Sequence, residues 1–459
     1  MSSPPKRSAF EMAFYISVCA GMAMGTSSFL IVAGAFEALS AGFVLLAIVA
    51  AMTFCVLISS PIAEMAAMFP SSPGVRTYVR QAYGDRVSLF VVFLYLLFVV
   101  VAAGAEAYMF GYVVRAIVPQ IGMWVAALAL IALVAGVNWL GVTPSRRTQI
   151  LTTAILSLGV LAFGGGALVS GVTSASAPAA ATLSTGEQLA ALPTVMGICV
   201  FLFIGFEWVT PLGFGPDAYA RKIPLAMPAG IGLNGLLYLV FVAGIAQVMS
   251  PAEISATPAP QLPLARKLLG DAGLGAALAL CVFATTSTFN AGVMGGARLV
   301  YALARERRLP AWCAYFHAER GVPRGAIALL AALCAVSTAI IIAWDVQLAA
   351  ACLASTLICT VYAALMASAR KLRQTQAKRR RSFRARFGET PMLVLAILVF
   401  GLGLASIGAE PRQTLEVAAA TAACGLAAVA LARWSLGLSG KSGKAAPAKA
   451  SPAEDSATT

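Results

Sequence analysis

Residues 205–213 read Gly-Phe-Glu-Trp-Val-Thr-Pro-Leu-Gly and lie within an apolar run long enough to cross a membrane. Residues 21–28, with the sequence Gly-Met-Ala-Met-Gly-Thr-Ser-Ser, interrupt the first apolar run in the same way. Pro211 cannot donate a backbone hydrogen bond, and in hydrocarbon an interrupted helix survives only where it lines a cavity buried in protein. The pair therefore predicts two broken membrane helices, with glycines that merely allow close helix packing as the alternative.

The composition is that of an integral membrane protein. The 459 residues are 60% hydrophobic and 11% charged, with a mean hydropathy of +0.87, whereas soluble domains carry about 25% charged residues. This excludes a soluble enzyme, a nucleic-acid-binding module and a disordered protein. The nine cysteines and the single histidine, His317, show no disulfide or metal-ligand spacing, so we expect no cofactor and no metal.

Twelve apolar runs approach the roughly 20 residues that a membrane-crossing helix needs. They cover residues 12–38, 41–67, 87–118, 121–140, 148–170, 192–218, 224–250, 273–304, 325–343, 346–369, 391–408 and 412–434. The expected organisation is a cytoplasmic N-terminus (1–11), a first repeat of five helices (12–170), an outer loop (171–191), a second repeat of five helices (192–369), a basic cytoplasmic loop (370–390), two further helices (391–434) and a disordered cytoplasmic tail (435–459).

Lysine and arginine are distributed unequally between the two sides of this topology. With the N-terminus inside, the inner segments hold 27 of the 32 basic residues and the outer segments hold four. Because cytoplasmic loops are enriched in Lys and Arg, we expect both termini in the cytoplasm, and the compact, Ala-rich chain favours a bacterial inner membrane. The basic segment 370–386 is expected to contact anionic lipid headgroups rather than nucleic acid.

The two interrupted runs are the first and the sixth, and they cross the membrane in opposite directions. Broken helices at corresponding positions of two halves are typical of transporters built from inverted repeats, in which substrate binds between the breaks. The spacing therefore predicts an all-α membrane protein with a five-plus-five inverted repeat.

Several longer motifs resemble the amino acid-polyamine-organocation transporters. They are residues 61–75 (Pro-Ile-Ala-Glu-Met-Ala-Ala-Met-Phe-Pro-Ser-Ser-Pro-Gly-Val) with 80–84 (Arg-Gln-Ala-Tyr-Gly), 203–207 (Phe-Ile-Gly-Phe-Glu), 290–310 and 321–323 (Gly-Val-Pro). The resemblance extends over roughly residues 15–325. It implies the leucine-transporter-type fold, with ten core helices plus two C-terminal ones, and secondary transport of small amino acids or amines.

The resemblance also implies a substrate site at the two breaks. Backbone amides around Met24, Gly25, Thr26 and Ser27 would face a substrate carboxylate, because amides exposed at a helix end attract anions. Carbonyls near Phe203, Ile204 and Phe206 would face the substrate ammonium. The family usually shows Gly-small-Gly where this chain has Gly25-Thr26-Ser27, and the side chain at Ser27 narrows the close approach that glycine allows. This leaves room for an amine without a carboxylate.

Two acidic residues within the spans are candidates for coupling or gating, because ionisable groups are costly in a membrane. Glu207 matches the family's sixth-helix motif. It is either a proton-linked or gating carboxylate or a structural acceptor for the freed amides of the first helix. Glu106, in the third span, either binds an ammonium group or carries a proton, or it is hydrogen-bonded near the outer interface.

Three other features have both a structural and a functional interpretation. Trp208 either closes over a bound cation with its ring face or only packs. Glu64, at the inner end of the second span, is expected to pair with Arg76, Arg80 or Arg298, with a role in transport as the alternative. The hydroxyls of Thr286 and Ser287, within the run 285–288, are a possible sodium site, with local hydrogen bonding to carbonyls as the alternative.

The sequence thus predicts a permease that works by alternating access, as a proton-coupled symporter or an exchanger, with uniport also open. The fifth span carries no Lys that could replace sodium. A membrane-embedded sensor that binds an amino acid or amine without moving it is the alternative function. We expect no enzyme and no primary pump, because no nucleophile–base set and no ATP-binding loop is visible. Oligomeric state is not predicted.

Overall fold

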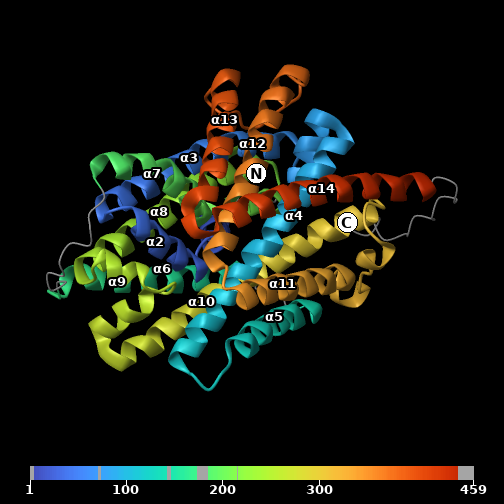
Figure 1. Cartoon of the computed structure of the whole chain (residues 1–459). Helices are drawn as coiled ribbons and strands as arrows, with labels where there is room; N and C mark the ends of the chain where they lie inside the picture. Colours follow the sequence, from blue (N-terminus) through green and yellow to red (C-terminus); the bar gives the residue numbers. More distant parts are fainter. Residues whose placement is uncertain (1–4, 71–73, 142–145, 173–183, 214, 443–459) are drawn as a thin grey trace.

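A computed structural model describes residues 5–70, 74–141, 146–172, 184–213 and 215–442, and these residues form helices and no strand (Figure 1). Ten helical segments are long and apolar enough to cross a membrane. Two further spans are the interrupted first one and the shorter apolar helix α5. The twelve expected spans are therefore present.

The spans follow one another with short connections. In chain order they are α1 (Pro5–Gly21) with α2 (Ser27–Ala38), α3 (Ala41–Met68), α4 (Val75–Ile117), α5 (Met123–Trp139), α6 (Arg146–Val169), α7 (Thr185–Cys199) with η1 (Val200–Phe203) and η2 (Phe206–Leu212), η3 (Ala218–Lys222) with α8 (Ile223–Val248), α10 (Gln261–Arg305), α11 (Arg324–Trp344), α12 (Gln347–Thr375), α13 (Glu389–Ala405) with η6 (Ser406–Ala409), and η7 (Pro411–Gln413) with α14 (Thr414–Ser442). The connections contain α9 (Pro251–Ser255), η4 (Ala311–Ala314) and η5 (Ala318–Arg320).

Several helices extend beyond the apolar runs. The third span continues from an N-terminal helical piece that starts at Val75 and is bent at Gly84, where φ is 82°. In α10 a similar bend at Gly270, with φ of 61°, separates an outer piece from the eighth span. Helix α12 includes the first residues of the basic segment 370–390, and α14 runs on to Ser442, past residue 434. Within the expected outer loop 171–191, α7 already begins at Thr185, and residues 173–183 lie outside the described residues. The expected disordered tail 435–459 is helical up to Ser442, and its residues 443–459 lie outside the described residues.

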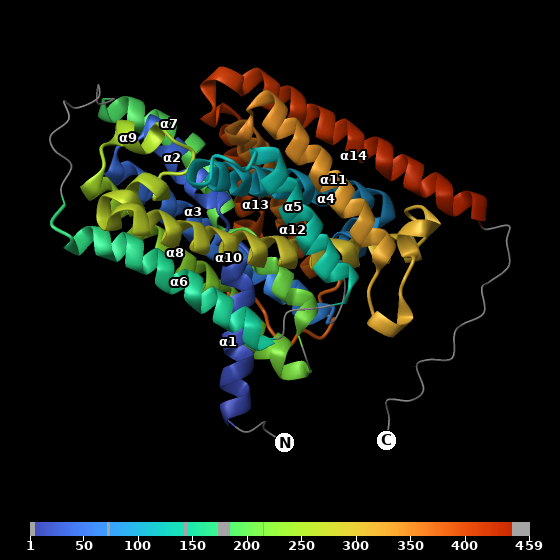
Figure 2. The ribbon, with the colours of Figure 1, turned by 90° about the horizontal axis from the view of Figure 1, so that it is seen from below.

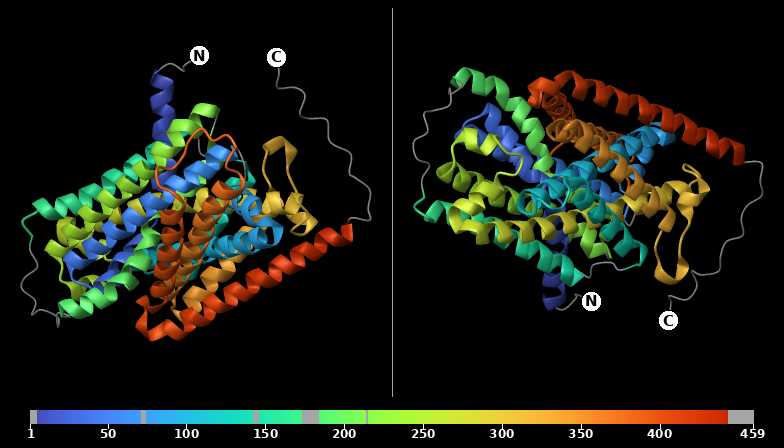
Figure 3. Two further views of the ribbon diagram at one scale, coloured as in Figure 1. Left: turned by 90° about the horizontal axis from the view of Figure 1, so that it is seen from above. Right: turned by 60° about the horizontal axis from the view of Figure 1, so that its bottom comes forward.

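The spans surround a central pair formed by α4 and α12. Helix α4 also packs against α10, α11 and α14, whereas α8 packs against α1, α3 and α6. The N-terminal end of α1 projects from the bundle, and α14 runs along one side of the molecule (Figures 2 and 3). Leucines on α14 are strongly exposed, with Leu415 at 81% and Leu426 at 72%, as expected for a helix that faces lipid.

Ion pairs join two basic segments that the sequence places on the inner side. Arg76 is 2% exposed and contacts Asp85 and Glu306, and Asp85 also contacts Arg308. These pairs tie the start of α4 to the segment that follows α10. The two basic segments therefore meet at one end of the bundle.

Glu64 anchors the basic loop after α12. Arg373 Nη2 and Arg381 Nη1 lie 2.5 and 2.6 Å from its carboxylate, and the amide of Ala385 donates to it at 3.0 Å. The expected partners Arg76, Arg80 and Arg298 are therefore wrong, although an ion-paired structural role is found. The sequence could not show that the loop folds back across α3, because its arginines are more than 300 residues away along the chain.

Candidate functional site

The first span breaks between Gly21 and Ser27, and two amides at this break bind a carboxylate. The amide of Thr26 donates to Glu106 Oε1 at 2.7 Å, and that of Ser27 donates to Glu106 Oε2 at 2.8 Å. Glu106 is 2% exposed and comes from α4. Two of the amides that were expected to face a substrate carboxylate, those of Thr26 and Ser27, therefore bind a carboxylate of the protein itself.

The surroundings of Glu106 fit its carboxylate closely. The hydroxyl of Thr285 donates to Oε1 at 2.8 Å and lies 2.7 Å from the hydroxyl of Thr26. A Cβ added to Gly25 would lie 2.6 Å from Oε2, so only glycine fits at this position without displacing the carboxylate. Glu106 is therefore bound at the break in the helix rather than near the outer interface.

The freed carbonyls of the first span are satisfied by other helices. Tyr238 donates to the carbonyl of Ala23 at 2.8 Å, and Asn234 donates to that of Ala20 at 3.2 Å. Thr288 donates to the carbonyl of Gly21 at 3.4 Å. Because polar side chains of α8 and α10 supply these partners, the break is a defined conformation and not a frayed helix end.

The second break lies between η1 and η2, at Gly205, where φ is 98°. Tyr95 and Tyr362 donate to the two oxygens of Glu207 at 2.7 and 2.9 Å, and the amide of Gly205 donates to Oε2 at 3.2 Å. Glu207 thus caps the break in its own span. The structural alternative, in which it caps the first helix, is wrong because Glu106 occupies that place.

The two breaks are in direct contact. A Cβ on Gly205 would lie 2.8 Å from Met22 Cβ, and the thiol of Cys19 lies 3.6 Å from the carbonyl of Phe206. Gly205 is thus required twice, by its positive φ and by this close approach.

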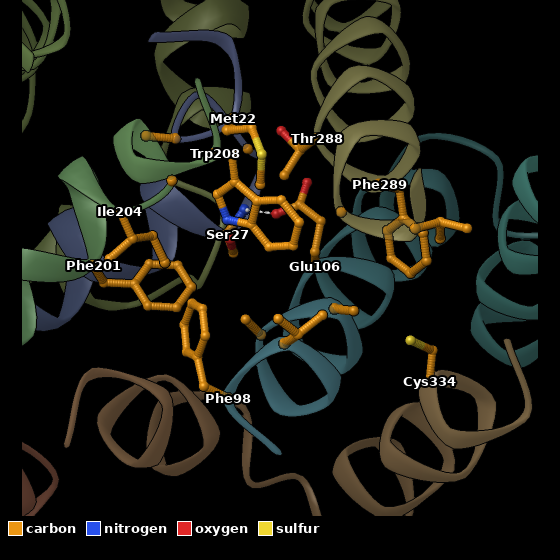
Figure 4. A pocket seen from close by; sticks show the side chains of 18 of the residues that line it. Met22, Ser27, Phe98, Glu106, Phe201, Ile204, Trp208, Thr288, Phe289 and Cys334 are labelled. Carbon is orange, nitrogen blue, oxygen red and sulfur yellow. Dashed lines mark hydrogen bonds between the residues drawn. The ribbon is translucent and has the colours of Figure 1, made fainter. Parts of the chain in front are cut away.

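A cavity of about 80 Å³ lies beside the breaks, with Glu106 between walls of aromatic and aliphatic side chains (Figure 4). Trp208, Phe98 and Phe201 lie on one side and Phe289 on the other. The lining residues are Met22, Ala23, Gly25, Ser27, Ser28, Phe98, Val99, Ala102, Ala103, Glu106, Phe201, Ile204, Gly205, Trp208, Thr288, Phe289, Gly292, Val293, Leu330 and Cys334.

Five residues of the predicted site line this cavity, namely Gly25, Ser27, Glu106, Ile204 and Trp208. The others lie behind it. Phe203 and Phe206 are fully buried and pack against Tyr238 and Tyr362, with ring centroids 6.3 and 5.5 Å apart. Met24 lines a separate small cavity, Thr26 contacts Thr285, and Glu207 is held by its tyrosines.

Trp208 forms part of the cavity wall and rests on a neighbouring helix. Its ring centroid lies 5.8 Å from that of Tyr95. A Cβ on Gly295 would lie 1.5 Å from Trp208 Cζ3, so the indole fills the space that this glycine of α10 leaves free. The position suits either interpretation of Trp208, packing or closure over a ligand.

Hydroxyl groups of the run 285–288 on α10 contact the first span, but the residues that do so differ from the predicted Thr286 and Ser287. Thr285 and Thr288, about one turn apart, reach Thr26 and Gly21. Among the described residues Ser287 Oγ is buried with no hydrogen-bond partner. Within the described run 285–288, Thr285 and Thr288, and not Thr286 or Ser287, donate or accept hydrogen bonds that join α10 to the first break. Helical periodicity could have pointed to the pair 285 and 288 instead.

Sequence reasoning missed most of the apolar lining. Phe98, Phe289, Leu330 and Cys334 come from α4, α10 and α11, and nothing distinguishes them from other apolar residues of those spans. Tyr95 and Tyr362, which hold Glu207, carried no sequence signal either. In the described parts of the chain no group of three or more His, Cys, Asp or Glu could hold a metal.

The comparisons with known proteins agree with this architecture. The chain is 26% identical over 309 residues to an uncharacterised transporter of Mycobacterium tuberculosis, covering 66% of this chain and 67% of the relative. It is 26% identical over 332 residues to an aromatic amino acid transport protein of Escherichia coli, covering 69% and 71%. A manganese transporter of Eremococcus coleocola, solved with an aromatic bis-isothiourea compound, has a similar fold, with a TM-score of 0.61 at 13% identity over 96% of this chain and 97% of that one.

The family comparison covers most of the chain. Residues 15–409, which include both breaks and every residue that lines the cavity, match the amino acid permease family. The protein therefore belongs to the amino acid permease family, within the amino acid-polyamine-organocation superfamily.

Proposed function

We propose that this transporter is a secondary permease that carries a small amino acid or amine by alternating access, through the cavity between its two interrupted spans. The observation that carries the proposal is the contact of two broken helices beside a cavity that contains a buried carboxylate. Breaks at corresponding places of two repeats form the substrate site in transporters of this architecture. The aromatic amino acid transport protein among the relatives supports a substrate of this size and class.

We further propose that transport is coupled to protons, by symport or exchange. Glu106 and Glu207 are buried carboxylates within the spans, and each sits at a break. Glu106 lines the cavity, so a proton on it and a substrate beside it would influence each other directly. A sodium site at Thr286 and Ser287 has less support, because their hydroxyls are not among those that contact the first span.

The proposed location is the inner membrane of a bacterium, with both termini in the cytoplasm. The excess of Lys and Arg in the inner segments supports this orientation. The ion pairs that gather these segments at one end of the bundle also support it. The exposed arginines of the loop after α12 would lie at the level of anionic headgroups.

The test is uptake into liposomes that contain the purified protein. Labelled neutral, acidic and basic amino acids and amines without a carboxylate are offered with and without an inward proton gradient, in sodium-free and sodium-containing buffer. We expect one class to accumulate when the gradient is imposed and accumulation to stop when a protonophore is added. Saturable binding without uptake and without exchange against preloaded ligand would contradict transport. If uptake instead requires sodium in the buffer and not the proton gradient, sodium and not the proton is the coupling ion.

A further inference from the structure

Resting on the proposed function, we infer that the substrate is a small organic amine that lacks an α-carboxylate, because Glu106 takes the place that such a carboxylate would occupy. The carboxylate of Glu106 accepts hydrogen bonds from two amides of the first break, from Thr26 at 2.7 Å and from Ser27 at 2.8 Å. Amides at a helix break are the natural site for the carboxylate of an amino acid. In this chain the protein supplies that group from α4.

A second carboxylate has no free position beside the first. Gly25 is already so close to Glu106 that a single added carbon would lie 2.6 Å from Oε2. An incoming carboxylate would have to share the amides of Thr26 and Ser27 with Glu106, although two like charges at that distance repel each other strongly. The break is therefore closed to an anion while Glu106 is charged and in place.

The charge of the cavity favours a cation. Of the described residues that line it, none is Lys, Arg or His, and Glu106 is the one carboxylate. No lining side chain could therefore balance the charge of a substrate carboxylate. An ammonium group, in contrast, would neutralise a charge that is otherwise unpaired in a low-dielectric site.

The carboxylate of Glu106 also has one hydrogen-bond acceptor position that no described protein group fills. A carboxylate accepts roughly four hydrogen bonds, about two on each oxygen. Oε1 accepts from the amide of Thr26 and from the hydroxyl of Thr285, whereas Oε2 accepts from the amide of Ser27. An ammonium can donate to the remaining position on Oε2, because Glu106 itself lines the cavity.

The rest of the lining suits an apolar substituent on that amine. Trp208, Phe98, Phe201 and Phe289 present aromatic rings around the cavity (Figure 4). Rings of this kind bind hydrocarbon and also attract a cation at their faces. The site therefore fits a primary amine with a small apolar or aromatic tail.

The experiment compares amines with the amino acids that differ from them only by the α-carboxylate. The probes are 3-methylbutylamine with leucine, phenethylamine with phenylalanine, and ethanolamine with serine. Binding to the full-length protein in detergent and uptake into liposomes are measured for each pair. We expect the wild type to prefer the amine at least tenfold in the pair that it recognises. A preference for the amino acid would overturn the inference.

The variant Glu106→Ala tests whether Glu106 causes this preference. It should lose amine uptake at least tenfold and should gain binding of the matching amino acid, whose carboxylate can then reach the amides of Thr26 and Ser27. Acetate should raise the melting temperature of the variant, and not that of the wild type, by refilling the same position. An unchanged preference in a folded variant would show that Glu106 is not the cause.

The possible failures can be distinguished. If Glu106→Ala does not fold, the preference of the wild type still decides the matter. If the wild type prefers amino acids yet accumulates them, the permease function stands and the inference on substrate class fails. If the wild type moves neither member of any pair, and no other compound of the uptake panel, the proposed function fails and the inference fails with it.

Discussion

Each interrupted span leaves backbone amides without a partner in the helix, and a buried glutamate accepts hydrogen bonds from amides at each break, but the two glutamates come from different places. At the first break the freed amides of Thr26 and Ser27 bind Glu106, which comes from another span and lines the cavity. At the second break Glu207 binds the amide of Gly205, two residues before it, and two tyrosine hydroxyls behind the cavity. Both carboxylates are buried within the spans, but only the first is available to a ligand.

The difference teaches that the donors around a carboxylate matter as much as its burial. Backbone amides can only donate, whereas a tyrosine hydroxyl can donate or accept. Glu106 therefore depends on its negative charge, and Glu207 does not depend on it to the same degree. The four predictions below test this contrast, beginning with the substitution of largest expected effect.

Replacing Glu106 with Gln should cause the largest loss. In either orientation of the new amide, its NH₂ group faces the amide of Thr26 or of Ser27, and one buried donor stays unsatisfied. This costs about 1–3 kcal/mol, and with the lost charge we expect a decrease in uptake of roughly a hundredfold, equivalent to about 2.7 kcal/mol. Uptake into liposomes and thermal unfolding in detergent measure both effects.

The matched control is Glu207→Gln. Its carbonyl oxygen can accept from Gly205 and Tyr362 while its NH₂ donates to the hydroxyl of Tyr95, so every partner is kept. We expect a melting temperature close to that of the wild type. Equal destabilisation by the two substitutions would refute the contrast between the breaks.

Replacing Gly25 with Ala should have the second-largest effect. The new Cβ would lie 2.6 Å from Glu106 Oε2 and would push the carboxylate away from its amides. Overpacking of this kind costs about 1–3 kcal/mol, and we expect uptake to fall roughly thirtyfold, about 2 kcal/mol. Gly292→Ala is the control, since Gly292 also lines the cavity but has nothing within 4 Å of an added Cβ. Similar losses in both variants would indicate a general effect of filling the cavity.

Replacing Gly295 with Ala tests what the second break contributes to the cavity. The added Cβ would lie 1.5 Å from Trp208 Cζ3, so the indole must leave its position in the wall. We expect a loss of substrate affinity of about tenfold, or about 1.4 kcal/mol, together with the destabilisation of about 1–3 kcal/mol that overpacking causes. Titration of tryptophan fluorescence with substrate measures the affinity. Unchanged affinity would show that Trp208 only packs.

The smallest effect is expected from Tyr362→Phe, which removes one of three donors to Glu207. A net hydrogen bond is worth about 0.5–1.5 kcal/mol, so the melting temperature should fall slightly and uptake should change by only a few-fold. Tyr95→Phe removes the other hydroxyl and provides the comparison, because the Tyr95 ring also contacts Trp208. A loss as large as that of Glu106→Gln would show that Glu207 needs its full charge.

Much of the fold was predictable because it depends on local composition. The length of each apolar run, the positions of Gly and Pro at residues 21–28 and 205–213, and the distribution of Lys and Arg are properties of neighbouring residues. They are sufficient to predict twelve spans and two breaks. The ends of α4, α12 and α14 were less predictable, because helices continue into polar residues at the membrane surface.

The site was predictable only in part. Gly25, Ser27, Ile204 and Trp208 line the cavity because they belong to the breaks themselves. The side chains of Phe203 and Phe206 are fully buried outside the cavity lining, whereas the expectation for these residues concerned their carbonyls and stays a prediction. The aromatic lining from other spans carries no signal in a sequence that is 60% hydrophobic.

The sequence by itself determined that this chain crosses the membrane, where its helices break and which acidic residues lie within its spans, because hydrophobicity and backbone breaks act over a few neighbouring residues. Only the tertiary structure decided that Glu106, some 80 residues away along the chain, binds the amides of the first break, and that Glu207 caps the second. The physical reason is that unpaired amides in a low-dielectric interior require an acceptor, and the packing of α4 against the first span determines which acceptor reaches them.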